Sequence, residues 1–152
     1  MSTSEHPADL ALIDTNVLVY AADTTAAFHE QAKQLRDCGI RGELPLAVSP
    51  QVLLEFFAVV TSPRRVAQPR SPEEAREEIE KYVRAPAIRK IHPGGDILNR
   101  VLTLLQQYPQ VARQEVFDLF LVGTMLANSV TRIYTYNREH FTHFEDITVL
   151  VP

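Results

Sequence analysis

Short apolar runs alternate along this chain with longer segments of helical periodicity. The short runs predict strands at residues 10–13, 46–48, 87–91, 132–136 and 147–151. Apolar residues at helical spacing predict helices over residues 26–38, 51–60, 72–84, 96–108 and 115–128. Strands separated by helices and short connections predict an α/β fold, in which a parallel sheet is covered by crossover helices.

Several boundaries of these elements carry signals of their own. Ser49-Pro50 and Ser71-Pro72 each offer a serine at the N-cap and a proline at the first helical position. Gly39 is expected to end the helix before it. Residues 62–72 predict a loop rich in Pro and Arg, and a turn after the first strand leads into the apolar stretch 17–22.

Three carboxylates lie in apolar surroundings, where an ionised group is costly. Asp14 ends the first predicted strand, Glu55 lies within VLLEFFAVV, and Asp118 lies within VFDLFLV. Burying an isolated carboxylate costs several kcal/mol or more unless a partner compensates it. The carboxyl ends of the strands are where an open α/β sheet carries its site, so Asp14 marks the place to expect one.

Each acid also has an ordinary structural explanation. Asp14 is a suitable N-cap, Glu55 shares a polar stripe with Gln51, and Asp118 has Glu115 on a possible solvated face. One shared cause accounts for all three together, because a divalent cation takes oxygen ligands and relieves the repulsion between neighbouring carboxylates. The three acids therefore predict a site for Mg²⁺ or Mn²⁺.

Composition narrows the class of protein. A chain of 152 residues with 45% hydrophobic and 22% charged residues predicts one folded domain. Cys38 is the single cysteine, which excludes a disulfide framework. The formal net charge of −4 argues only weakly against nucleic-acid binding, because an acidic cation site can act on phosphates. No signal peptide or bilayer-length apolar run is visible, so we expect a soluble cytoplasmic protein.

Three segments resemble the PIN domain, in the small form typical of VapC-type toxins: ALIDTNVLVYA, VLLEFF and VFDLFLVGTMLANSVTRIYTYNREHF. The resemblance covers nearly the whole chain. It implies a single PIN-like domain over residues 1–152, with residues 1–9 as a flexible N-terminal segment. The implied fold is a three-layer α/β/α fold with a central parallel sheet of roughly four to five strands. The resemblance also implies a Mg²⁺- or Mn²⁺-dependent ribonuclease, paired with a small antitoxin and usually a homodimer.

The resemblance assigns roles to particular positions. The three acidic metal-site positions are matched by Asp14, Glu55 and Asp118. Supporting polar positions are matched by Thr15, Asn16, Thr135 and Asn137. Many relatives carry Asp at or near Asn137 and at the place of His140, so a second ion is less firmly implied here. Two roles remain open for His140: a metal ligand or general base, or a loop residue that packs its ring.

The implied reaction is hydrolysis of an RNA phosphodiester that leaves a 5′-phosphate end. Candidate phosphate contacts are the arginines of the loop and one near the last motif: Arg64, Arg65, Arg70 and Arg138. Two other functions stay open. One is a PIN-like module that binds RNA or a protein without cutting it. The other is a receiver or haloacid-dehalogenase-like domain, although Asn16 stands where such a domain carries a second Asp.

Overall fold

The structure, a computed structural model, describes residues 7–152. Within them lies one sheet of five parallel strands in the order β3-β2-β1-β4-β5. The strands are β1 (Ala11–Ile13), β2 (Leu46–Val48), β3 (Arg89–Lys90), β4 (Arg132–Tyr134) and β5 (Thr148–Leu150). The predicted α/β fold with a central parallel sheet is confirmed.

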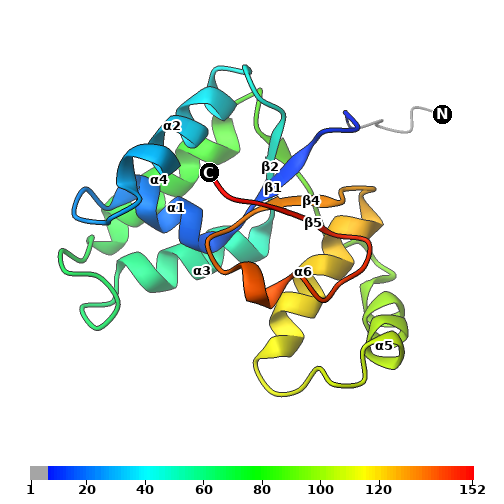
Figure 1. Ribbon diagram of the computed structural model, residues 1–152. Helices are drawn as coiled ribbons and strands as arrows, with labels where there is room; N and C mark the ends of the chain where they lie inside the picture. Colours follow the sequence, from blue (N-terminus) through cyan, green and yellow to red (C-terminus); the bar gives the residue numbers. More distant parts are fainter. Residues whose placement is uncertain (1–6) are drawn as a thin grey trace.

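Helices cover both faces of this sheet, which gives the three layers (Figure 1). The helices are α1 (Thr15–Ala22), α2 (His29–Ile40), α3 (Pro50–Val60), α4 (Pro72–Arg84), α5 (Ile97–Gln107) and α6 (Glu115–Ala127). Helices α1 to α4 gather on one side, while α5 and α6 pack together on the other (Figure 1). A short 3-10 helix, η1 (Arg138–His140), follows β4.

Strand β1 occupies the centre of the sheet and the centre of the core. Residues 10–13 are at most 1% exposed, as expected for a strand with helices on both faces. The chain leaves β1 to build β2 and β3 on one side, and later returns to build β4 and β5 on the other. The carboxyl ends of β1 and β4 therefore flank a change of direction in the strand order, which is where such sheets form binding crevices.

The helix starts at the two serine-proline pairs are confirmed. The Ser49 hydroxyl accepts a hydrogen bond from the backbone N–H of Val52, with Pro50 in the first turn of α3. Ser71 and Glu74 form a reciprocal capping box at the start of α4. Both caps satisfy backbone donors that the first turn of a helix leaves free. Because α3 carries Glu55, its cap also fixes where that acid lies.

The prediction that Gly39 ends a helix is wrong. Helix α2 starts later than expected, at His29, and runs through Gly39 to Ile40. A Cβ at Gly39 would lie 2.6 Å from Leu46 Cδ1, so this glycine allows α2 to approach β2 closely. The glycine with a left-handed backbone at the end of α2 is instead Gly42, with φ of 77°.

Other boundaries differ from the predictions by a few residues. The apolar stretch 17–22 lies in α1, which begins two residues earlier at Thr15, and the last three strands are shorter than their apolar runs. Residues 7–9 form a turn in which the N–H of Leu10 donates to the carbonyl of Pro7, and the rest of the expected flexible segment lies outside the described residues. No helix of residues 7–152 is long and apolar enough to cross a bilayer.

Candidate active site

Asp14, Glu55 and Asp118 come from three separate elements and line a single cavity of about 460 Å³. Asp14 follows the last residue of β1, Glu55 lies in the middle of α3, and Asp118 lies in the first turn of α6. We call this cavity the acid pocket. Glu55 and Asp118, which are 63 positions apart in the sequence, thus face one space at the carboxyl end of the sheet.

The buried Asp14 carboxylate is held by three hydrogen-bond donors. Its Oδ1 accepts from the N–H of Thr15 at 2.8 Å, which makes Asp14 the N-cap of α1. Its Oδ2 accepts from the Thr135 hydroxyl at 2.8 Å and from the Asn16 amide at 3.0 Å. Asp14 is 7% exposed and lines the acid pocket. The same residue therefore caps α1 and contributes to the site.

Asn16 and Thr135 join the ends of β1 and β4. The Asn16 amide nitrogen also donates to the Thr135 hydroxyl at 3.1 Å, and its carbonyl oxygen accepts from the N–H of Tyr136 at 3.0 Å. Thr135 accepts a further hydrogen bond from the N–H of Asn137 at 2.9 Å. The network fixes the Asp14 carboxylate across the crevice between the two strands. Asn137 itself lines the acid pocket.

Glu55 is oriented from two directions. Its Oε2 accepts from the Thr15 hydroxyl at 2.8 Å, and its Oε1 accepts from the Gln51 amide at 3.0 Å. The Gln51 amide also donates to the backbone carbonyl of Phe117 at 2.9 Å, which ties α3 to the first turn of α6. Glu55 and Gln51 share one face of α3, as the polar-stripe explanation predicts. That face is turned toward the acid pocket, which Glu55 lines.

Asp118 lies opposite these groups and is half-buried. Its Oδ2 lies 3.4 Å from Nδ1 of His140, which belongs to η1 and also lines the acid pocket. His140 therefore faces the acids and is not simply a packed loop residue. Among the described residues, no Lys or Arg lies within ion-pair distance of Asp14, Glu55 or Asp118.

The electrostatics of the acid pocket disfavour negative charge. Burial is the largest cause that raises the pKa of Asp14, and the charge of Glu55 raises it further, against hydrogen bonds from Thr135 and Thr15 that lower it. Burial likewise raises the pKa of Asp118 to about 6; His140 opposes this, while the charges of Asp14 and Glu55 add to it. Carboxylates that raise one another's pKa are typical of functional sites.

The donor set suits a hard divalent cation. Three carboxylates and the Asn137 amide supply oxygen atoms around one cavity, and within residues 7–152 none of the three carboxylates forms an ion pair with a Lys or Arg. Within residues 7–152, however, no three His, Cys, Asp or Glu side chains already stand close enough together to hold a metal ion. The types of residue therefore fit a divalent ion, but in this conformation the carboxylates are too far apart to bind one ion together.

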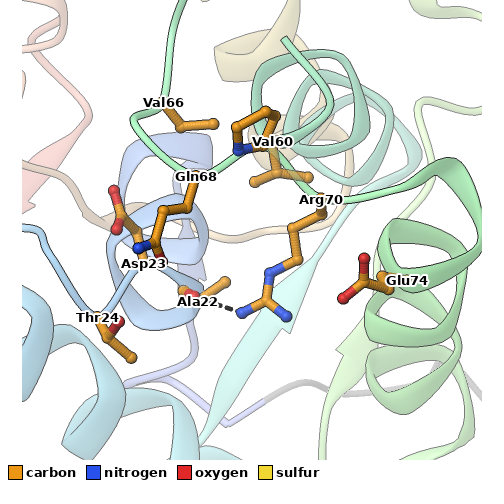
Figure 2. Close-up of a pocket in the computed structure, with 9 residues that line it drawn as sticks. Ala22, Asp23, Thr24, Val60, Val66, Gln68, Arg70 and Glu74 are labelled. Carbon is orange, nitrogen blue, oxygen red and sulfur yellow. Dashed lines mark hydrogen bonds between the residues drawn. The ribbon is translucent and has the colours of Figure 1, made fainter. Parts of the chain in front are cut away.

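The predicted arginines do not all lie at the acid pocket. Arg65 lines it, whereas Arg64 and Arg138 are exposed and do not. Figure 2 shows Arg70 in a different pocket of about 230 Å³, where its guanidinium donates to the backbone carbonyl of Ala22 at 2.6 Å. Arg70 thus ties the loop after α3 to the end of α1.

Two residues of the site were not predicted from the sequence. Gln51 orients Glu55, and its position one helical turn before Glu55 is the signal that could have identified it. Tyr20 contributes a wall of the acid pocket from α1. Nothing in its local sequence distinguishes Tyr20 from an ordinary core aromatic.

Comparison with known proteins agrees with this geometry. Residues 11–147 match the PIN domain family. The ribonuclease VapC24 of Mycobacterium tuberculosis is 30% identical to the chain over 133 residues, which cover 87% of this chain and 89% of that protein. The chain therefore belongs to the PIN domain family, whose ribonucleases generally use divalent metal ions.

Solved structures with low sequence identity share the fold. VapC20 of Mycobacterium tuberculosis, described as a toxin that cleaves the sarcin-ricin loop, has a TM-score of 0.63 at 16% identity and covers 86% of this chain and 92% of its own. A chain of the VapBC2 complex of Rickettsia felis, bound to a promoter DNA fragment, has a TM-score of 0.62 at 16% identity and covers 93% and 98%. These neighbours confirm the PIN fold and leave the haloacid-dehalogenase-like alternative unsupported.

Proposed function

We propose that this chain is a metal-dependent ribonuclease, the toxin of a toxin–antitoxin pair, that hydrolyses RNA phosphodiester bonds and leaves 5′-phosphate ends. The observation that carries the proposal is the acid pocket, in which Asp14, Glu55 and Asp118 face one cavity without a Lys or Arg partner among the described residues. The ribonuclease relatives and the PIN domain match support the same reaction class.

Asp14 and Asp118 would be the main ligands of the cation. Asp14 is fixed by three side-chain and backbone donors, so it offers a rigid anchor, whereas Asp118 brings a carboxylate of raised pKa from the opposite wall. Bound there, Mg²⁺ or Mn²⁺ would neutralise charge on the phosphate and make a coordinated water more acidic. Hydrogen bonds from neighbouring residues that orient the metal ligands support the precise geometry that phosphoryl transfer requires.

Glu55 would act on the attacking water. Both of its oxygens accept hydrogen bonds, from Thr15 and Gln51, which hold the carboxylate toward the cavity. A carboxylate in this position can accept the proton that water loses as it attacks the phosphorus in line with the departing 3′ oxygen. Arg65, in the wall of the acid pocket, is placed to contact a phosphate oxygen of the RNA.

An antitoxin is the partner that this function requires. A ribonuclease free in its own cell damages the host, and one solved structure of similar fold is a toxin–antitoxin complex from Klebsiella pneumoniae. We also propose that the chain acts in the cytoplasm, where its RNA substrate lies, and that it forms a homodimer. Growth arrest on expression without an inhibitor protein, relieved by coexpression of the antitoxin, is the expected result in cells.

The test is cleavage of total RNA by the purified chain, with the new ends mapped chemically. We expect cleavage with Mg²⁺ or Mn²⁺, none in excess EDTA, and recovery when the metal is restored. New 5′ ends should accept a ligated adaptor directly, since they carry phosphate. Activity that persists in EDTA, or that leaves 5′-hydroxyl ends, would contradict the proposal. Tight RNA binding without any cleavage would favour the alternative of a PIN-like binding module.

A further inference from the structure

Three aromatic side chains form a cluster beside the acid pocket: Tyr20 of α1, Phe28 just before α2, and Tyr136 after β4. We call them the aromatic platform. The rings of Phe28 and Tyr136 are stacked, with centroids 4.6 Å apart and planes 16° from parallel. Tyr20 packs against both, with ring centroids 6.0 Å from Phe28 and 5.3 Å from Tyr136.

The aromatic platform is fixed to the catalytic residues. Tyr20 lines the acid pocket, and Tyr136 directly follows Thr135, whose hydroxyl holds Asp14. The N–H of Tyr136 donates to Asn16 at 3.0 Å. On the other side, Nδ1 of the His29 ring lies 2.9 Å from the carbonyl oxygen of Tyr20, which ties the start of α2 to α1. The rings therefore keep a defined position relative to the acids.

Phe28 leaves a large part of its ring in contact with solvent. The residue is 46% exposed although Tyr136 covers one face of its ring, which leaves the opposite face as the one that a ligand can approach. Exposed aliphatic side chains such as Leu98, 71% exposed on α5, are ordinary on protein surfaces. Phe28 differs because its ring is flat, is supported from behind by a parallel ring, and lies in a cluster that reaches the acid pocket.

We propose that the open face of Phe28 stacks a nucleobase of the RNA next to the phosphate being cleaved. The inference rests on the proposed ribonuclease function and names a part of the substrate. A nucleobase suits this surface because it is planar and is attached to the phosphate that must enter the acid pocket. Stacking requires a base whose own face is free, so the aromatic platform selects unpaired nucleotides, as in loops and single strands.

Stacking on an aromatic side chain contributes to affinity without reading the base. Removing the ring should weaken binding of unpaired RNA by roughly 5- to 150-fold, the factor that corresponds to about 1–3 kcal/mol per stacked base. Loss should be similar for sequences that differ only in the stacked base, because every base has a π face. Duplex RNA should show little change, since its bases are already stacked.

The experiment measures binding by full-length Asp14→Asn protein in Mg²⁺, with fluorescence anisotropy of a short labelled RNA without secondary structure. In that background we expect Phe28→Ala and Phe28→Leu to weaken binding, and Phe28→Trp to retain it. Phe28→Leu keeps apolar volume without a flat ring, so it separates stacking from packing, and it carries the test if Phe28→Ala fails to fold. Leu98→Ala is the matched control and should bind as the parent does.

Each contrary result has a distinct meaning. Parental affinity in Phe28→Leu, or an equal loss for unpaired and duplex RNA, would overturn the stacking proposal. So would a Phe28→Ala protein that binds RNA normally and loses only its antitoxin. Cleavage of RNA by the chain with native Asp14 is measured in parallel. If it cleaves RNA while Phe28→Leu binds normally, only the stacking proposal fails; if it neither cleaves nor binds RNA, the proposed function fails too.

Discussion

Acidic side chains are concentrated in two regions, helix α4 and the acid pocket, and their surroundings are opposite in kind. On α4, Glu74 completes a capping box, Glu78 pairs with Lys81, and Glu80 pairs with Arg76 and Arg84. In the acid pocket, Asp14, Glu55 and Asp118 have no Lys or Arg partner within the part of the chain that the structure describes.

The difference shows which acids stabilise the folded state and which destabilise it. Acids in the first turn of α4 meet the positive end of the helix, and further along Glu78 and Glu80 meet cations one turn away. Burial, and to a smaller extent repulsion between the acids of the pocket, raises the pKa of Asp14 and of Asp118. An arrangement that costs folding free energy in the absence of a ligand is understandable where a cation is to be bound.

The largest expected effect is on catalysis by Asp14→Asn. The amide keeps the size of the side chain but removes the charge that would hold the cation, which contributes several kcal/mol of transition-state stabilisation. We expect RNA cleavage to fall by about 10³-fold or more, since each 1.36 kcal/mol is tenfold in rate. Growth arrest on expression should disappear.

Glu77→Gln is the matched control for that substitution. Glu77 is an exposed acid of α4 whose side chain forms no hydrogen bond or ion pair with any of residues 7–152. It should cleave RNA at the parental rate. Cleavage that survives Asp14→Asn at more than about a tenth of the parental rate would remove the distinction between the two regions.

Thr135→Val should have the next largest effect. The substitution keeps the shape of a side chain that is fully buried and removes the hydroxyl that donates to Asp14 at 2.8 Å. Loss of a group that orients a metal ligand typically costs about 10- to 100-fold in activity or metal affinity. Thr124→Val is the control, because Thr124 is also buried but donates only within α6. Equal activity of the two variants would contradict the positioning role of Thr135.

Sequence patterns were sufficient for the sheet, for five of the helices and for the three acids. Apolar runs bounded by turns define β1 and β2 well, and the serine-proline pairs define the starts of α3 and α4, because these signals are local. Asp14, Glu55 and Asp118 stood out because a charge within an apolar run requires an explanation. These three acids meet at one cavity because of the order of the strands in the sheet, and that order cannot be read from a local sequence pattern.

The remaining features depend on contacts between distant segments. Gly39 looks like a helix end in the sequence, yet its function is to let α2 approach Leu46. Arg70 resembles Arg65 in the loop, but only the structure shows that it binds the carbonyl of Ala22. The aromatic platform joins residues 20, 28 and 136, and no local spacing connects them.

Asp118→Asn should stabilise the metal-free protein. The folded-state pKa of Asp118 is raised from 3.8 to about 6, so the folded chain binds more protons than the unfolded chain between about pH 4 and 6. Its stability therefore falls as the pH rises through that window, and the amide removes this loss. In EDTA at pH 7.5 we expect the Tm to rise by about 2–4 °C, with the gain shrinking below about pH 6.

A bound cation should reverse this difference in Tm between Asp118→Asn and the parent. Mg²⁺ or Mn²⁺ stabilises a folded chain that binds it, so it should raise the Tm of the parent more than that of Asp118→Asn. Calorimetry at several pH values, with and without metal, makes the comparison. A lower Tm for Asp118→Asn in EDTA at pH 7.5 would show that Asp118 stabilises the fold, as the acids of α4 do.

Glu80→Gln makes the same change of carboxylate to amide on α4, and its effect should be the smallest and of opposite sign. Glu80 lies 2.6 Å from Arg76 and 3.5 Å from Arg84, both on the exposed surface of the helix. Such pairs contribute about 0.3–0.5 kcal/mol each and are screened by salt. The Tm should fall by about 1–2 °C at low ionic strength, and by less at high salt, with RNA cleavage unchanged. If Glu80→Gln raised the Tm as Asp118→Asn is expected to do, general relief of negative charge would explain both results, and the acid pocket would have no special cost.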